Sequence, residues 1–192
     1  LVQTPESLKA RFNLDVRPFH EVIQISPEEH TVTVRHDGQE FTENYNKLIL
    51  SPGAKPFVPV IEGLAEAKNT YTLRNVPDLD EIMAALDKHP KEAVVIGAGF
   101  IGLEMAENLA KRGLHVTIVE KAPHVLPPLD QEMAAFVQAE LVKNSVRVIT
   151  SQSATRFEEQ GKIIVLENGQ KITSDLTILS VGVEPENGLA KA

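Results

Sequence analysis

Three glycines in the stretch GAGFIG, residues 97–102, have the spacing that suits the binding of a dinucleotide. In a G-x-G-x-x-G loop, Gly97 permits a tight turn, Gly99 lets the backbone approach a pyrophosphate, and Gly102 lets a helix pack closely on the preceding strand. The start of that helix would offer unpaired amides and the positive end of its dipole to the phosphates. The competing interpretation is a set of glycines that only closes a turn. The other loop positions are also candidate cofactor contacts: Ala98, Phe100 and Ile101.

Two acidic residues follow the loop at positions from which they could contact a bound dinucleotide. Glu120 ends the next apolar strand, 23 residues after Gly97, where an acid can bind both ribose hydroxyls of the adenosine half. A carboxylate there repels a 2′-phosphate and favours NADH, whereas Lys121 could bind that phosphate and leaves NADPH open, unless it is only a surface lysine. Glu104, early on the helix, could point toward the nicotinamide end or simply complement the helix dipole.

A third candidate contact lies in SVGVEPE, residues 180–186, where the chain leaves an apolar strand through a glycine. Ligands of parallel sheets bind at the carboxyl ends of strands, so the amides of Val181 and Gly182 are candidate cofactor contacts. A glycine turn that serves only the path of the chain is the alternative.

Around the loop, strands alternate with helices, which predicts an α/β fold with a Rossmann-like, doubly wound parallel sheet whose strands are joined by right-handed crossovers. A helix with Asn75 as its N-cap and Pro77 in its first turn precedes the strand that begins at Ala93. Beyond the loop helix we expect a strand at 116–119, a helix at 131–144 and a short strand at 146–149. Residues 153–172 read as a small antiparallel meander, and the apolar run 176–182 as the last central strand.

The first third of the chain has a different pattern. Alternating segments between residues 16 and 50 predict an antiparallel meander that ends in a buried strand, Lys47 to Leu50. The proline-rich stretch that follows, residues 51–64, reads as a connector between two domains.

Composition excludes several classes of function. The net charge of −8 repels phosphate backbones and anionic lipids, so neither nucleic acid nor a membrane is an expected partner. No apolar run approaches the roughly 20 residues of a transmembrane helix, and no signal peptide is recognisable, so we expect a cytoplasmic protein. The absence of cysteine excludes disulfides, thiolate metal sites and a thiol nucleophile in this chain. The six histidines are scattered, and no metal site is expected.

The order of these segments resembles the pyridine nucleotide-disulfide oxidoreductases, flavoproteins that bind two dinucleotides. The resemblance covers nearly the whole chain, in YNKLILSPGAKP, TLRNVPDLDEI, the stretch from VVIGAGFIGLEM to LPPLDQEM, and LTILSVGVEPE. The opening LVQTPESLKARFNLDVR, together with SPGAKP and TLRNVPD, is similar to the branch of coenzyme A-disulfide reductases and NADH-dependent persulfide reductases, often fused to a rhodanese domain. NADH oxidases and peroxidases are close relatives in that branch.

The resemblance implies that an NADH-binding domain is inserted into an FAD-binding domain. Residues 1–71 would then be part of the FAD-binding domain, 72–183 a Rossmann-like NAD(P)H-binding domain, and 184–192 the start of the return segment. The resemblance also implies residue roles. Ser51, Pro52 and Gly53 would contact FAD, and Phe100 would gate the nicotinamide pocket. Glu104 would lie beside the nicotinamide, Glu120 would bind the ribose, and Gly182 would lie on the far side of the cofactor.

The family's FAD glycine motif, redox cysteine and dimerisation domain are missing from this stretch. We therefore expect an internal fragment, a monomer or weak dimer without turnover, of a homodimeric parent enzyme. In that parent, NADH would reduce FAD, and an upstream cysteine would then attack a disulfide or persulfide of a small thiol such as coenzyme A. The alternatives are an NADH oxidase or peroxidase, a ferredoxin or nitrite reductase component, and a stand-alone NADH-sensing module.

Overall fold

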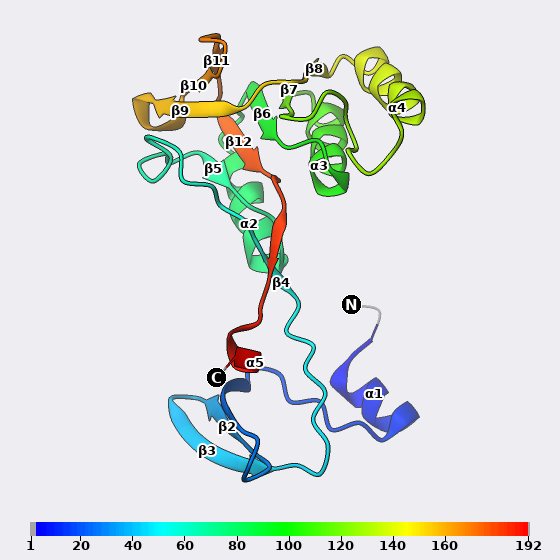
Figure 1. Ribbon diagram of the computed structural model, residues 1–192, viewed down its shortest axis with the longest axis vertical. Helices are drawn as coiled ribbons and strands as arrows, with labels where there is room; N and C mark the ends of the chain where they lie inside the picture. Colours follow the sequence, from blue (N-terminus) through cyan, green and yellow to red (C-terminus); the bar gives the residue numbers. More distant parts are fainter. Residues whose placement is uncertain (1–2, 192) are drawn as a thin grey trace. The chain divides into compact units, whose positions relative to one another are not determined.

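The computed structural model describes residues 3–191, which form two compact units (Figure 1). The first unit runs to Gly53 and includes the chain again from Pro185 onward, and the second is Ala54–Glu184. The chain thus leaves the first unit once and returns once, as an inserted domain does. Residues 54–71, which the resemblance assigned to the first domain, are grouped with the second unit because Ile61 and Leu64 pack against its core.

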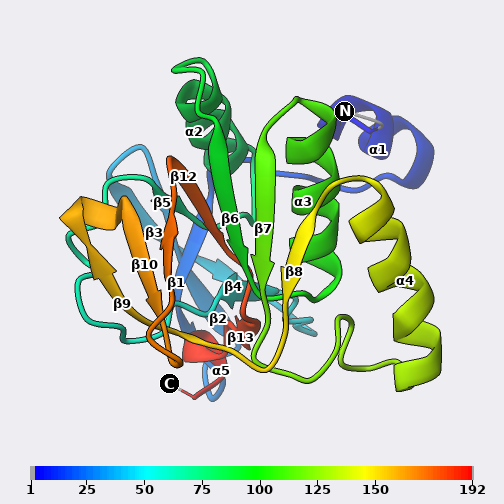
Figure 2. The ribbon, with the colours of Figure 1, turned by 90° about the horizontal axis from the view of Figure 1, so that it is seen from above.

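The second unit is built on a five-stranded parallel sheet, as the alternation of strands and helices predicts. Figure 2 shows its central strands side by side. The strand order is β5 (Thr70–Tyr71), β12 (Leu176–Leu179), β6 (Glu92–Ile96), β7 (His115–Val119) and β8 (Arg147–Ile149). The chain passes from β6 toward β7 on one side, whereas β12 returns on the other. The carboxyl ends of β6 and β12 therefore flank a switch point, the place where open parallel sheets bind ligands.

Helices cover one face of this sheet, and an antiparallel sheet covers the other (Figure 1). Side chains alternate along β6, so Val95 faces the helices and Val94 faces the antiparallel sheet. The helices are α2 (Val76–Leu86), α3 (Phe100–Lys111) and α4 (Gln131–Lys143). The antiparallel strands are β9 (Ala154–Glu158), β10 (Ile163–Leu166) and β11 (Lys171–Thr173). The prediction of an α/β fold with a parallel sheet and a β-meander is confirmed.

The start of α2 follows the sequence rule for a helix N-terminus. Asn75 accepts a hydrogen bond from the amide of Asp78 at 3.0 Å, and Asp78 accepts one in return from the amide of Asn75 at 3.1 Å. The predicted N-cap is therefore confirmed. None of the described helices is long and apolar enough to cross a membrane.

The first unit contains the predicted antiparallel meander, β1 (Glu21–Ser26), β2 (Thr31–His36) and β3 (Gln39–Asn44). Its small core consists of Ile25, Val32 and Val34, with Leu189 of α5 (Gly188–Lys191) packed against it. An additional helix, α1 (Pro5–Phe12), begins after Thr4, whose hydroxyl accepts a hydrogen bond from the amide of Ser7 at 3.2 Å.

The predicted buried strand from Lys47 to Leu50 is wrong for this structure. These residues form no strand, and Ile49 is 88% exposed. A buried strand needs neighbouring strands to satisfy its backbone and to cover its side chains. No strand in the described part of the chain pairs with this segment, so its apolar side chains remain uncovered.

The two crossings between the units run as a paired ribbon. β4 (Ala54–Pro56), inside the proline-rich connector, pairs with β13 (Val183–Pro185). The amide of Phe57 donates to the carbonyl of Gly182 at 3.0 Å, and the amide of Glu186 donates to the carbonyl of Gly53 at 2.9 Å. The outgoing and returning segments are therefore hydrogen-bonded neighbours.

Candidate functional site

The glycine loop connects β6 to α3 at the switch point of the sheet. Gly97 follows the last residue of β6 with a φ of 103°, a backbone conformation that glycine adopts without strain. Its amide donates to the carbonyl of Val119 at 2.8 Å, which ties the loop to the end of β7. Gly99 is the N-cap of α3.

The three glycines differ in what an added side chain would meet. A Cβ atom at Gly97 would overlap the carbonyl oxygen of Ser180, and one at Gly102 would overlap the carbonyl oxygen of Gly97. At Gly99 a Cβ would have no heavy atom within 4 Å beyond its chain neighbours, and the φ of −76° is open to any residue. Gly97 and Gly102 are therefore needed by the fold, whereas Gly99 faces open space that another molecule could fill.

The start of α3 presents donors to that open space. The first N–H groups of an α-helix have no partner within the helix, which applies here to the amides of Phe100 and Ile101. The helix dipole adds partial positive charge at the same end. Together with the open space at Gly99, these amides could bind the oxygens of a pyrophosphate.

The carboxylate of Glu120 lies against the same loop. The residue follows β7 and is 9% exposed, and its Oε2 accepts a hydrogen bond from the amide of Ala98 at 2.6 Å. Its Oε1 accepts one from the amide of Ala122 at 2.7 Å. Each carboxylate oxygen retains further acceptor capacity, which ribose hydroxyls could use. Lys121, next to it, is exposed.

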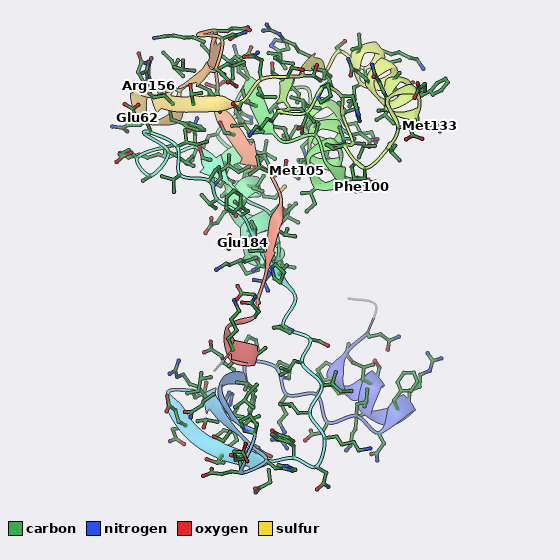
Figure 3. The ribbon with its side chains drawn as sticks, in the orientation of Figure 1. Glu62, Phe100, Met105, Met133, Arg156 and Glu184 are labelled. Atoms are coloured by element: carbon green, nitrogen blue, oxygen red, sulfur yellow. The ribbon has the colours of Figure 1, made fainter. Side chains whose placement is uncertain are left out.

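Phe100 and Glu104 lie one turn apart on α3, and both are exposed, Phe100 to 66%. Figure 3 labels Phe100 on this helix. Both residues line two hollows that flank this helix. The hollow shared with α2 has a volume of about 550 Å³, and the hollow shared with α4 has about 500 Å³. The aromatic ring and the carboxylate could thus contact a ligand that extends past the helix start.

The segment after β12 borders the loop on its other side. Gly182 has a φ of 125°, and a Cβ there would meet no atom within 4 Å, while Val181 is 37% exposed. The structure thus brings together the predicted loop, Glu120 and the pair Val181 and Gly182. The predicted FAD contacts, Ser51, Pro52 and Gly53, belong to the first unit, where all three are exposed.

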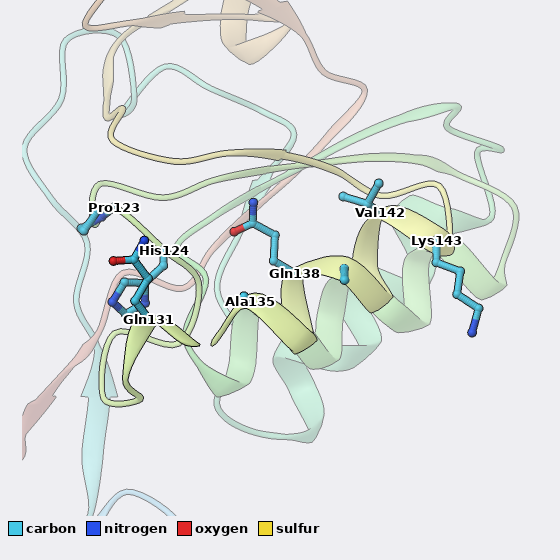
Figure 4. A pocket seen from close by; sticks show the side chains of 8 residues that line it. Pro123, His124, Gln131, Ala135, Gln138, Val142 and Lys143 are labelled. Carbon is cyan, nitrogen blue, oxygen red and sulfur yellow. The ribbon is translucent and has the colours of Figure 1, made fainter. Parts of the chain in front are cut away.

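A further hollow, of about 640 Å³, runs along α4 and contains none of the predicted site residues. Figure 4 shows its lining, which extends from Pro123, His124 and Gln131 at the start of α4 to Val142 and Lys143 near its end. No acidic side chain lines it, and no group of metal-ligating side chains occurs within residues 3–191.

Two residues that hold the loop were not singled out from the sequence. The hydroxyl of Ser180 lies 3.0 Å from the carbonyl oxygen of Gly97, to which it donates. The amide of Leu126 donates to the carbonyl of Ala98 at 2.8 Å. The position of Ser180 directly after β12 could have indicated its contact with the loop, because the carboxyl end of this strand lies beside the glycine loop. A backbone contact such as that of Leu126 leaves no signature in the sequence.

The comparison with known sequences gives a family. The family described as pyridine nucleotide-disulphide oxidoreductase matches residues 4–192. An NADH oxidase of Methanocaldococcus jannaschii is 37% identical over the whole chain, and a coenzyme A disulfide reductase of Staphylococcus aureus is 35% identical. The chain spans only 43% of the length of each of these two relatives.

Solved structures agree with this result. A reduced CoADR-RHD of Bacillus anthracis matches the whole chain with a TM-score of 0.96 and 49% identity, and the match covers 35% of that chain. An NAD-dependent persulfide reductase from A. fulgidus matches 98% of this chain and 35% of its own, with a TM-score of 0.90 and 33% identity. A water-forming NADH oxidase from Lactobacillus brevis, bound to NADH, matches 98% of this chain and 42% of its own, with a TM-score of 0.86 and 28% identity. By the extent of the family match and the glycine loop at its switch point, the chain belongs to the pyridine nucleotide-disulphide oxidoreductase family.

Proposed function

We propose that this chain is the NADH-binding portion of a flavoprotein that reduces the disulfide or persulfide of a small thiol of the coenzyme A type. The observation that carries the proposal is the glycine loop, where the outward amides of Phe100 and Ile101 meet the open space at Gly99. Relatives named as a coenzyme A disulfide reductase and a persulfide reductase support the substrate class. The thiol chemistry itself would use a cysteine, and this chain has none.

The residues of the site fit a dinucleotide from end to end. The amides of Phe100 and Ile101 would bind the pyrophosphate, and Glu120 would accept hydrogen bonds from the adenosine ribose. Phe100 and Glu104 would border the nicotinamide end, and the amides of Val181 and Gly182 would border its far side. The dinucleotide supplies a hydride when bound, and these side chains and amides bind and orient it.

NADH is the proposed nucleotide because a buried carboxylate at Glu120 disfavours the 2′-phosphate of NADPH. Lys121 is exposed beside it and is the residue through which NADPH would be accommodated. FAD is the proposed second cofactor, with Ser51, Pro52 and Gly53 as its contacts in the first unit. A bound flavin would accept the hydride, and the backbone of Ser51, Pro52 and Gly53 would run close to that flavin.

An NADH oxidase is the second candidate activity. It is favoured by the relative of that name, which is 37% identical, and by the neighbour bound to NADH. Both candidates require the same nucleotide site, and they differ in the electron acceptor. The acceptor depends on residues outside this chain.

The test is calorimetric titration of residues 1–192 with NADH and NADPH, for the wild type and for two glycine variants. Gly99→Val places a side chain where the pyrophosphate would lie, and an overlap worth about 1–3 kcal/mol corresponds to about 5- to 150-fold weaker NADH binding. Gly188→Val is the matched control, because a Cβ at Gly188 also meets no atom within 4 Å. Saturable NADH binding that weakens only in Gly99→Val supports the site. Absence of binding by the folded wild type, or equal weakening in both variants, refutes it.

A further inference from the structure

The side chain of Glu120 connects two separate pieces of backbone. Its Oε2 binds the amide of Ala98 in the glycine loop at 2.6 Å, and its Oε1 binds the amide of Ala122 just beyond β7 at 2.7 Å. Its own backbone is fixed as well, because its amide donates to the carbonyl of Ile149 at 2.8 Å and its carbonyl accepts from the amide of Gln152 at 3.1 Å. A buried carboxylate held in this way has little freedom to move.

The contact with Ala98 completes the hydrogen bonding of the tight turn. At Gly97, the amide donates to Val119 and the carbonyl accepts from Ser180. At Ala98, the carbonyl accepts from the amide of Leu126, and the amide has Glu120 as its acceptor. All four polar groups of these two residues are therefore paired inside the protein, and one of the four partners is a charged side chain.

Ala98 is fully buried, so its amide has no access to water in the intact protein and depends on the carboxylate as its acceptor. A buried donor without an acceptor is costly, and a hydrogen bond to an ionised acceptor is stronger than one between neutral groups. The loop would have to move to relieve that cost, and the neighbouring amides of Phe100 and Ile101 would lose their alignment.

We propose that Glu120 is a positioning residue that holds the glycine loop in its binding shape before any nucleotide arrives. This role rests on the proposed nucleotide site and deepens it, because the carboxylate then supports the pyrophosphate-binding amides in addition to contacting the adenosine ribose. A residue that acted only on the ribose would leave the exchange of the Ala98 amide unchanged when it is removed from the nucleotide-free chain.

The chain contains a matched control at the opposite end of β6. Oδ2 of Asp175 accepts hydrogen bonds from the amides of Lys91 and Glu92 at 2.9 Å and 3.0 Å. This carboxylate also joins two pieces of backbone, but it lies before the amino end of β12, away from the glycine loop. Replacing it disturbs the sheet without touching the nucleotide site.

The first measurement uses NMR to record the rate of amide hydrogen exchange in the chain without nucleotide. In Glu120→Ala the amide of Ala98 should exchange about 10- to 150-fold faster than in the wild type, the loss expected for one charge-assisted hydrogen bond. Glu120→Gln, which keeps one acceptor oxygen, should show a smaller change. Asp175→Ala should accelerate the exchange of the Lys91 and Glu92 amides and leave that of the Ala98 amide unchanged. An Ala98 amide that exchanges at the wild-type rate in Glu120→Ala overturns the proposal.

The second measurement is titration of the same variants with both nucleotides. Glu120→Ala should bind NADH about tenfold or more weakly, and Asp175→Ala should bind both nucleotides as the wild type does. Wild-type NADH affinity in Glu120→Ala would contradict the positioning role. If the wild type bound neither nucleotide, the proposed function would fail, whereas the exchange of Ala98 would still decide whether Glu120 holds the loop.

Discussion

A pair of alanine substitutions separates the glycine that the fold needs from the glycine that faces open space. In Gly97→Ala, the new Cβ overlaps the carbonyl oxygen of Ser180, and the backbone has a φ of 103° that L-residues rarely adopt. Backbone strain costs about 1–3 kcal/mol, and forced overlap costs about 1–3 kcal/mol. The sum of about 2–6 kcal/mol is a large part of the about 5–15 kcal/mol that stabilises a typical domain.

In Gly99→Ala the same change should leave the stability almost unaltered. The φ of −76° suits alanine, and no atom lies within 4 Å of the added carbon. Alanine is a poorer N-cap than glycine, but it also restricts the unfolded chain, and these opposing effects leave a net change within about 1 kcal/mol.

The assay is urea unfolding with far-UV circular dichroism as the probe, because this signal reports on helices α2, α3 and α4 of the second unit. The midpoint should fall clearly for Gly97→Ala and stay near the wild-type value for Gly99→Ala, with similar slopes. A Gly97→Ala protein as stable as the wild type, or equal losses in both variants, would refute the assignment of these glycines to different tasks.

Three further predictions concern residues outside the loop. The pKa of Asp175 lies below its ordinary value of 3.8 because its carboxylate accepts hydrogen bonds from the amides of Glu92 and Lys91. The stabilising effect of the carboxylate is therefore complete above the ordinary pKa and is lost as the pH falls through the lower pKa of the folded state. Urea midpoints measured from pH 7 downward should show a weaker acid dependence in Asp175→Asn. Asn75→Ala removes the cap of α2 and should lower the free energy of unfolding by about 0.5–2 kcal/mol without changing nucleotide affinity, as urea unfolding and calorimetry would measure. Ile164→Ala, in the fully buried centre of β10, should cost about 2–5 kcal/mol in the same unfolding experiment, and a loss below 1 kcal/mol would contradict its place in the core.

Much of the second unit could be predicted because its local signals agree with one another. The apolar strands, the glycine loop and the Asn75 cap each specify an element from a few neighbouring residues, and the structure contains all of them. The order of the strands is less accessible, because the insertion of β12 between β5 and β6 depends on contacts between distant residues.

Predictions failed where the outcome depends on neighbours rather than on the segment itself. Lys47 to Leu50 has the composition of a buried strand, but composition does not supply the strands that would pair with it. The site shows the same limit. The distance of Glu120 from the glycines along the sequence was enough to place it beside the loop. Its hydrogen bond with the amide of Ala98 depends on the residue at which β7 ends, which the sequence does not specify.

The pairing of β4 with β13 has a consequence for how this family can be rearranged. The outgoing and returning segments are neighbours, with Gly53 and Glu186 joined by a hydrogen bond of 2.9 Å, so Ala54–Glu184 leaves and rejoins the rest of the chain at adjacent points. In this respect it resembles a cassette. A short turn in place of the cassette would leave the path of the first unit uninterrupted, and another cassette could be grafted onto the same two strands. Exchange of such units between enzymes would then require a match at this ribbon, where backbone pairing makes few demands on side chains.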